Sequence, residues 1–172
     1  MVETMLGEAI RRSGIPPKAI AAETNYSVDA IYAACQGKRK IPRDATRKLS
    51  SVNMLAGMAV ALQETGYRVF EFFSGDRHPQ TMLRRVEKED SEADEALKGI
   101  GWRTIDKDSP EDLTEDDRTA LKIAAKEVAD RIKTDFNLLV EWDDRYQLGI
   151  LDYLIGKNKK ALGSAQGTYK TI

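Results

Sequence analysis

Apolar residues recur every three or four positions in the segments where they gather, and this spacing predicts an all-α fold. In MLGEAIRRSG, near the start, Leu6, Ala9 and Ile10 share one face of a first helix. Farther along, RDATRKLSSV and MLAGMAVALQETG predict two more helices, the second of which is apolar enough to be a core helix.

The segment between the first of these helices and the other two, Ile15–Pro42, has the spacing of small, apolar and turn residues expected of two short helices joined by a tight turn. The first helix starts at Pro17, because a missing N–H is harmless at that position. Asn25 tolerates the left-handed conformation that a sharp turn needs. Ser27 can cap the second helix with its hydroxyl, and Gly37 ends that helix.

This pattern resembles the helix-turn-helix domains of the Cro and phage-repressor class, the Xre family. The residues that match the family motif are Ile20, Ala21, Tyr26, Ser27, Ile31, Gly37 and Pro42. Asn25 stands where the family has a turn glycine. The resemblance covers about residues 3–66, and it implies a five-helix, λ-repressor-like DNA-binding domain over residues 1–66. In that geometry the second motif helix lies in the major groove.

The resemblance also implies two sets of DNA contacts. Base edges face Ser27, Val28, Asp29, Tyr32, Ala33 and Gln36, where apolar side chains suit thymine methyls and polar ones suit base or phosphate edges. Phosphates face Lys18, Lys38, Arg39, Lys40 and Arg43, with Arg47 extending the strip. Two positions depart from the family. Pro17 replaces a polar phosphate contact, and the second motif helix carries Asp29 but no Lys or Arg.

The second half of the chain predicts a junction and two further helices. Five aromatic or branched residues crowd YRVFEFF, a pattern that allows a short strand or a helical continuation, and we interpret residues 67–78 as an aromatic junction that packs the two halves together. A charged amphipathic helix follows from Pro79 to about Lys98. A second helix of about thirty residues starts at Thr114, where TEDD places acids in the first turn.

The long helix has an apolar stripe made of Leu121, Ala125, Val128, Ile132, Phe136, Leu139 and Trp142 or Tyr146. A helix of this length favours pairing, so residues 79–156 are expected to form a helical oligomerisation or effector region that makes the protein a homo-oligomer. The alternative is that these helices fold back onto the aromatic segment as one monomeric core. The polar, basic residues 157–172 are expected to be a flexible tail.

Charge is unevenly distributed although the net charge is only −1. Residues 1–50 hold nine Lys and Arg against five Asp and Glu, whereas residues 79–145 hold twelve against nineteen. A basic head on an acidic body suits binding to DNA phosphates through the head. Ordinary solvated helix faces would give the same numbers.

The composition leaves little room for catalysis or metal binding. A single Cys and a single His exclude an internal disulfide and the usual zinc ligand sets. Cys35 is expected to be packed rather than reactive, and His78 to stabilise a turn. Phosphate-cradle glycine motifs are absent from the sequence, and helix capping explains the acidic runs DKDSPED and TEDD. We expect no enzyme activity, no cofactor and no metal.

The longest apolar run, Met54–Leu62, is far shorter than the ~20 residues of a membrane helix, and the first residues do not resemble a signal peptide. A cytoplasmic protein without membrane contact is therefore expected. The leading hypothesis is a sequence-specific, double-stranded-DNA-binding transcriptional regulator of bacterial or phage type, acting as a dimer or higher oligomer. Two alternatives remain: a phage-encoded helix-turn-helix scaffold that binds or inhibits a protein partner, and a DNA replication or packaging accessory factor.

Overall fold

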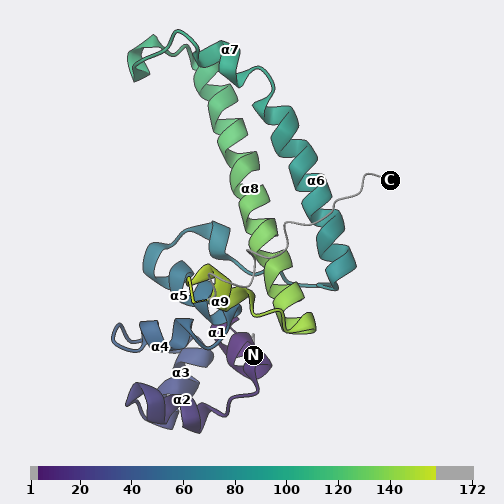
Figure 1. Ribbon diagram of the computed structural model, residues 1–172. Coiled ribbons are helices and arrows are strands. Elements are labelled where there is room, and N and C mark those ends of the chain that lie inside the picture. Colours follow the sequence, from purple (N-terminus) through teal and green to yellow (C-terminus); the bar gives the residue numbers. More distant parts are fainter. Residues whose placement is uncertain (1–3, 158–172) are drawn as a thin grey trace.

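The computed structural model describes residues 4–157; residues 1–3 and 158–172 lie outside it, and with them almost all of the predicted tail 157–172. All regular elements in the described part are helical, which confirms the predicted all-α class. Figure 1 shows a small bundle of short helices at one end, the head, and a two-helix arm that rises from it. None of the helices between residues 4 and 157 combines the length and the apolar character needed to cross a bilayer.

The head consists of five helices around one core. They are α1 (Met5–Ser13), α2 (Pro17–Thr24), α3 (Val28–Cys35), α4 (Thr46–Ser50) and α5 (Met54–Thr65). The largest fully buried apolar side chains are Ile20, Ile31, Leu49 and Leu55. Each stabilises the fold by about 1.5–3 kcal/mol through burial, so these positions hold the helices against one another.

Side-chain caps start the helices of the head where the sequence supplies a hydroxyl or an amide. The Oδ1 of Asn53 accepts a hydrogen bond from the Ala56 N–H at 2.8 Å and so begins α5. The Nδ2 of the same residue donates to the Ala9 carbonyl at 2.8 Å. One side chain therefore both caps α5 and fixes α1 against it.

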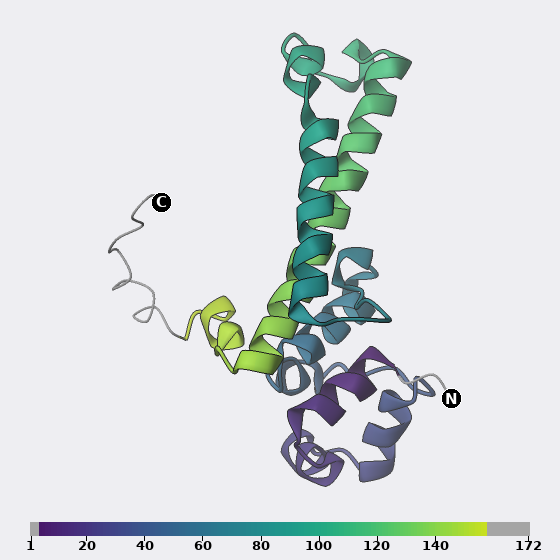
Figure 2. The same ribbon diagram turned by 90° about the vertical axis from the view of Figure 1, so that its right-hand side faces the viewer.

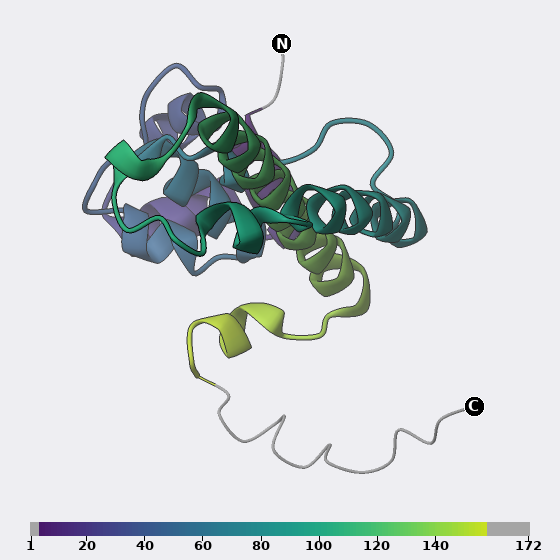
Figure 3. The same ribbon diagram turned by 90° about the horizontal axis from the view of Figure 1, so that it is seen from above.

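The arm is a helical hairpin. It follows the 3-10 helix η1 (Arg68–Phe70), and its elements are α6 (Pro79–Leu97), α7 (Ile100–Thr104), the 3-10 helix η2 (Pro110–Asp112), α8 (Glu115–Tyr146) and α9 (Ile150–Leu154). Figure 2 shows α6 and α8 side by side along most of the arm, and Figure 3, seen from above, shows α9 to the side of them. With 32 residues, α8 is about 48 Å long.

The start of α8 is set by a capping box. The Thr114 hydroxyl accepts from the Asp117 N–H at 3.1 Å, and the Asp117 carboxylate accepts from the Thr114 N–H at 3.1 Å. The carboxylate also accepts from the Thr114 hydroxyl at 2.7 Å, and this bond, together with the one from the Thr114 N–H, lowers the pKa of Asp117. The acidic run TEDD therefore serves helix capping, as predicted.

The arm buries much less apolar surface than the head does. Its fully buried apolar side chains are few and include Met82, Ala93 and Ala124. Of the stripe predicted along α8, Val128 is half-buried and Ile132 keeps 40% of its surface exposed. Ala125 is exposed, and the buried positions of α8 include Ala124, Thr134 and Leu138 instead. The stripe predicted from the spacing is therefore not the most buried face of α8, because a hairpin offers this helix only one neighbouring helix.

The segment between the two parts contacts both of them. It contains η1, continues without regular secondary structure, and forms no strand. Phe70 packs on Phe136 of α8 with ring centroids 5.8 Å apart, and both side chains pack against the head core. Val140 of α8 is itself a member of that core. Head and arm therefore share buried surface at their junction.

A buried amide fixes this segment to α8. Asn137 is 0% exposed, and its Oδ1 accepts from the Phe73 N–H at 2.9 Å. Its Nδ2 donates to the carbonyls of Glu71 and Lys133 at 2.9 and 2.8 Å. The amide thus satisfies backbone groups that would otherwise be left without partners inside the junction.

Ion pairs between α1 and the base of the arm complete the junction. Arg12 of α1 contacts Glu141 at 3.2 Å and Asp144 at 2.9 Å, and Arg77 contacts Glu8 at 3.1 Å. Burial raises the pKa of Glu141, against the opposing effect of Arg12 and Arg77. These ion pairs join α1 to the base of the arm.

Candidate nucleic-acid interface

Helices α2 and α3 are joined by a tight turn whose geometry follows from its residues. Asn25 has φ 58° and ψ 31°, the left-handed conformation predicted for it, and its N–H donates to the Ala21 carbonyl. The Ser27 hydroxyl caps α3 by accepting from the Ala30 N–H at 3.2 Å. Pro17 stands in the first turn of α2, where its missing N–H costs nothing.

Gly37 allows the chain to leave α3. Its φ is 70°, and its N–H donates to the Ala34 carbonyl at 3.0 Å while the Lys38 N–H donates to the Ala33 carbonyl at 2.9 Å. A Cβ at this position would lie 2.9 Å from the Cγ2 of Thr4, closer than ordinary contacts allow. Glycine is therefore required both by the backbone and by the neighbouring α1 end.

The residues expected to face base edges differ in exposure. Ser27, Asp29 and Gln36 are exposed, and Tyr32 keeps 48% of its surface in solvent. Val28 and Ala33 are half-buried, and Val28 packs against the head core. The outer face of α3 thus presents a short polar and aromatic row, with Val28 and Ala33 at its border.

The residues expected to face phosphates are all exposed. This set is Lys18, Lys38, Arg39, Lys40 and Arg43. Over residues 4–157, none of these cations forms a salt bridge. Arg47 of α4 is likewise exposed and lies outside these pairs. A cation without an intramolecular partner keeps its full attraction for an external anion.

The acids of the head are fewer than the bases, and one of them is hydrogen-bonded. Residues 16–51 hold seven Lys and Arg but only three Asp and Glu. The Tyr26 hydroxyl donates to the carboxylate of Asp44, a bond that raises the pKa of Tyr26. Glu23 and Asp29 are exposed. The surface formed by α2, α3 and the loop after α3 is therefore basic in balance, with Asp29 as a local exception.

A mostly apolar cavity of about 330 Å³ opens beside the basic loop, between α1, the end of α3 and α5. Its apolar wall includes Met5, Ile41 and Leu62, and Arg39 and Lys40 stand at its edge. The side chains that line it within the described chain include no Asp or Glu. The cavity can therefore accept an apolar side chain or ligand group that is flanked by negatively charged groups.

Groups that could carry other chemistry have structural partners. His78 caps α6, because its Nδ1 accepts from the Gln80 N–H at 3.3 Å, as expected of a turn-stabilising residue. Cys35 is half-buried and packs against the head core. Neither residue has a geometry that calls for a chemical role.

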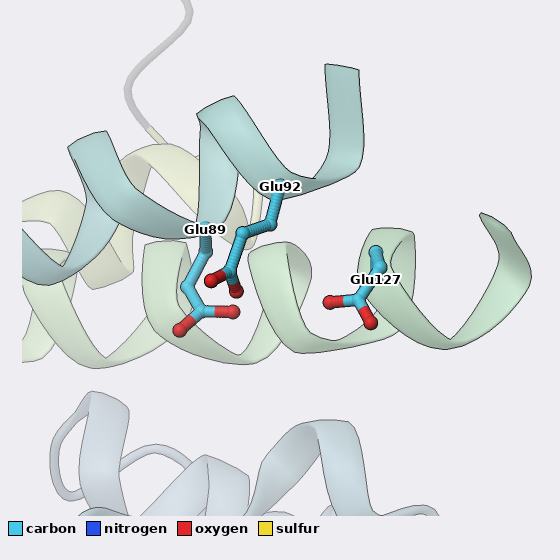
Figure 4. Close-up of side chains that lie close together, drawn as sticks. All are labelled: Glu89, Glu92 and Glu127. Atoms are coloured by element: carbon cyan, nitrogen blue, oxygen red, sulfur yellow. The ribbon is translucent and has the colours of Figure 1, made fainter. Parts of the chain in front are cut away.

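Three carboxylates on the arm lie close enough to suggest a metal site. Figure 4 shows Glu89 and Glu92 of α6 pointing towards Glu127 of α8. Lys88 pairs with the first two at 3.1 and 2.7 Å, and Lys126 pairs with Glu127 at 2.9 Å. Neighbouring lysines therefore already pair with the carboxylates that would have to bind a metal cation.

Sequence reasoning predicted an aromatic junction at residues 67–78 but missed the polar contacts that fix it. Arg12 and Glu141 are 129 residues apart, and Asn137 and Phe73 are 64 apart, so neither contact leaves a local signal. The guanidinium of Arg77 also lies over the Phe72 ring at 4.3 Å from its centroid. The only signal available was the crowding of aromatic residues in YRVFEFF.

No protein-family model, no curated protein and no solved structure matches this chain. What the head can bind therefore follows from its own geometry and charge.

Proposed function

We propose that the chain is a sequence-specific DNA-binding regulator of bacterial or phage type, with α2 and α3 as a helix-turn-helix and α3 in the major groove. The observation that carries the proposal is the outer face of α3, where Tyr32 and Gln36 are exposed beside a loop of three unpaired cations, Lys38, Arg39 and Lys40. A groove-reading helix needs such a face, together with charges that hold the backbone on either side of it.

In this proposal, phosphate contacts provide the affinity for DNA, and α3 provides the preference for a particular DNA sequence. Lys18 and Arg43 flank the three loop cations, so up to five phosphates are neutralised. Each neutralised phosphate adds about −0.9 to the slope of log affinity against log salt. Tyr32 and Gln36 supply hydrogen bonds to base edges. Asp29 either accepts from a cytosine amino group or weakens binding where no such group is present.

We further propose that the protein acts as a dimer or higher oligomer, because one small module buries too little surface, about 600–1,000 Å², for useful specificity. The arm supports this part of the proposal. The half-exposed edge of the α8 stripe, with Ile132 at 40% exposure, leaves apolar surface for a neighbouring copy.

The test is duplex binding across a salt series with two charge-matched variants of the full chain. Replacing Lys38, Arg39 and Lys40 by Ala removes three loop cations. Replacing Lys88, Lys122 and Lys126 by Ala removes the same charge from the arm. We expect the loop variant to lose affinity and about 2.7 units of salt slope, and the arm variant to keep both.

Sequence preference is measured separately by selection from a random duplex pool. Tyr32→Ala and Gln36→Ala should flatten the selected motif while leaving the salt slope unchanged, because neither side chain carries charge. Absent or salt-indifferent DNA binding by the unmodified chain would refute the regulator proposal. It would favour the alternative in which this scaffold binds a protein.

A further inference from the structure

The far end of the arm carries two large apolar side chains in solvent. Trp102 of α7 is 81% exposed and Ile105, just after α7, is 76% exposed. Figures 1 and 2 place α7 at the end of the arm opposite the head. An exposed Trp is unusual because its large apolar surface gains free energy when it is buried. Trp is also enriched among the residues that contribute most to binding at protein interfaces.

This arm tip, defined as residues 94–116, is acidic. It holds eight Asp and Glu against three Lys and Arg. Each of the three cations already has a partner in the tip or in α8: Lys98 pairs with Glu95, Arg103 with Asp116, and Lys107 with Asp106. The negative charge that surrounds Trp102 is therefore not neutralised locally.

The head has the complementary surface. The cavity of about 330 Å³ beside the basic loop is apolar inside, and Arg39 and Lys40 stand at its edge. An acid-rimmed Trp is what such a cavity can accept: the indole replaces water on the apolar wall, and the carboxylates meet the two cations.

We propose that the arm tip of one copy docks on the head of a second copy, with Trp102 in the cavity beside Arg39 and Lys40. The contact joins two different patches of the protein. Two copies that dock reciprocally form a closed dimer, whereas copies that dock head to tail form an open chain. The same tip cannot reach its own head, because the arm, about 48 Å long, holds them apart and the junction fixes its direction. Tip-to-tip contact would bring like charges together.

Docking has a consequence for the proposed function, on which this part of the inference rests. Arg39 and Lys40 are among the residues proposed to contact phosphates, so a docked copy and a DNA duplex compete for them. Self-association would then hold the head away from DNA, and DNA would release it.

The test measures self-association without DNA, so its outcome does not depend on whether the head binds DNA. The mass of the full chain is followed by analytical ultracentrifugation over a concentration series and at several salt concentrations. We expect association that weakens as salt rises. Trp102→Ala should weaken it by at least about tenfold, as expected for an interface anchor. Tyr67→Ala is the matched control, because Tyr67 is an exposed aromatic residue outside both patches, and it should leave association unchanged.

A charge-swap pair decides whether the partner surface is the cavity edge. R39E/K40E gives an acidic head. D106K/D108K/E111K gives a basic tip, with six Lys and Arg against five Asp and Glu over residues 94–116, so each variant alone should lose the association that depends on Trp102. Mixing them should restore association, because the acidic head of one variant meets the basic tip of the other.

Three outcomes overturn the proposal: a monomer at all concentrations, association whose strength and salt dependence Trp102→Ala leaves unchanged, and a charge-swap mixture that associates no better than either variant alone. The second outcome would point to the α8 stripe as the contact instead. Added duplex should abolish the difference in protein–protein association between the unmodified chain and Trp102→Ala. If that difference persists in the presence of duplex, the competition is refuted while docking stands.

Discussion

The junction between head and arm should depend on the side-chain amide of Asn137. This residue is fully buried, and two of its three hydrogen bonds reach across to the aromatic segment, at the Phe73 N–H and the Glu71 carbonyl. Its third bond goes to Lys133 one turn earlier in α8, where loss costs little. The perturbation is Asn137→Leu, which keeps the volume of the side chain and removes its hydrogen bonds.

The expected magnitude follows from the two long-range bonds. Each backbone group left without a partner costs about 1–3 kcal/mol when buried, and water entry at the junction reduces that figure, so we expect a loss of about 2–4 kcal/mol in the free energy of unfolding. For a chain of this size the midpoint of thermal unfolding should fall by roughly 2–4 °C per kcal/mol. Asn137→Ala should lose at least as much, because it adds a cavity.

The assay is urea unfolding followed by circular dichroism, with hydrogen exchange at residues 71–73 as a local readout. The exposed residue Gln80 provides the control, and Gln80→Ala should change stability by less than about 0.5 kcal/mol. A change below about 0.5 kcal/mol for Asn137→Leu, with unaltered exchange at residues 71–73, would refute the view that this amide fixes the junction.

Two further predictions concern a backbone position and an acid. Gly37→Ala should destabilise the head by about 1–2 kcal/mol from the left-handed conformation alone, with an added cost from the 2.9 Å approach to Thr4, measured by thermal unfolding. Hydrogen bonds from Arg68 and Lys133 lower the pKa of Glu71 from 4.5 to about 2. Because this folded-state pKa lies below the ordinary one, the contribution of Glu71 to stability is present above pH 4.5 and is lost as the pH falls towards 2.

Both predictions have matched controls. Gly14 has φ 68° but open space around it, so Gly14→Ala should show the backbone cost without the clash. Equal losses at the two glycines would argue against the Thr4 contact. For the acid, Glu71→Gln should remove part of the decline in stability between pH 4.5 and 2, and an unchanged pH profile would contradict the assigned ion pairs.

Much of the local structure was predictable because it depends on neighbours in the chain. Asn25 at the turn, Ser27 at the start of α3 and Thr114 at the start of α8 all cap or turn the backbone within three or four residues of themselves. Helical spacing likewise set the all-α class, because burial of an amphipathic face requires only that some partner exist. The cations of the proposed DNA interface were identifiable from their clustering in the sequence.

Other features were decided by the tertiary structure alone. The pairing of Arg12 with Glu141 and the clamp by Asn137 join segments far apart in the chain, and the sequence pattern around each residue is compatible with solvent. Residue types likewise do not reveal that Val28 turns partly into the core while Tyr32 faces outward, because both suit either place. Periodicity identifies which residues share a helix face, whereas packing in three dimensions decides which face is covered and what covers it.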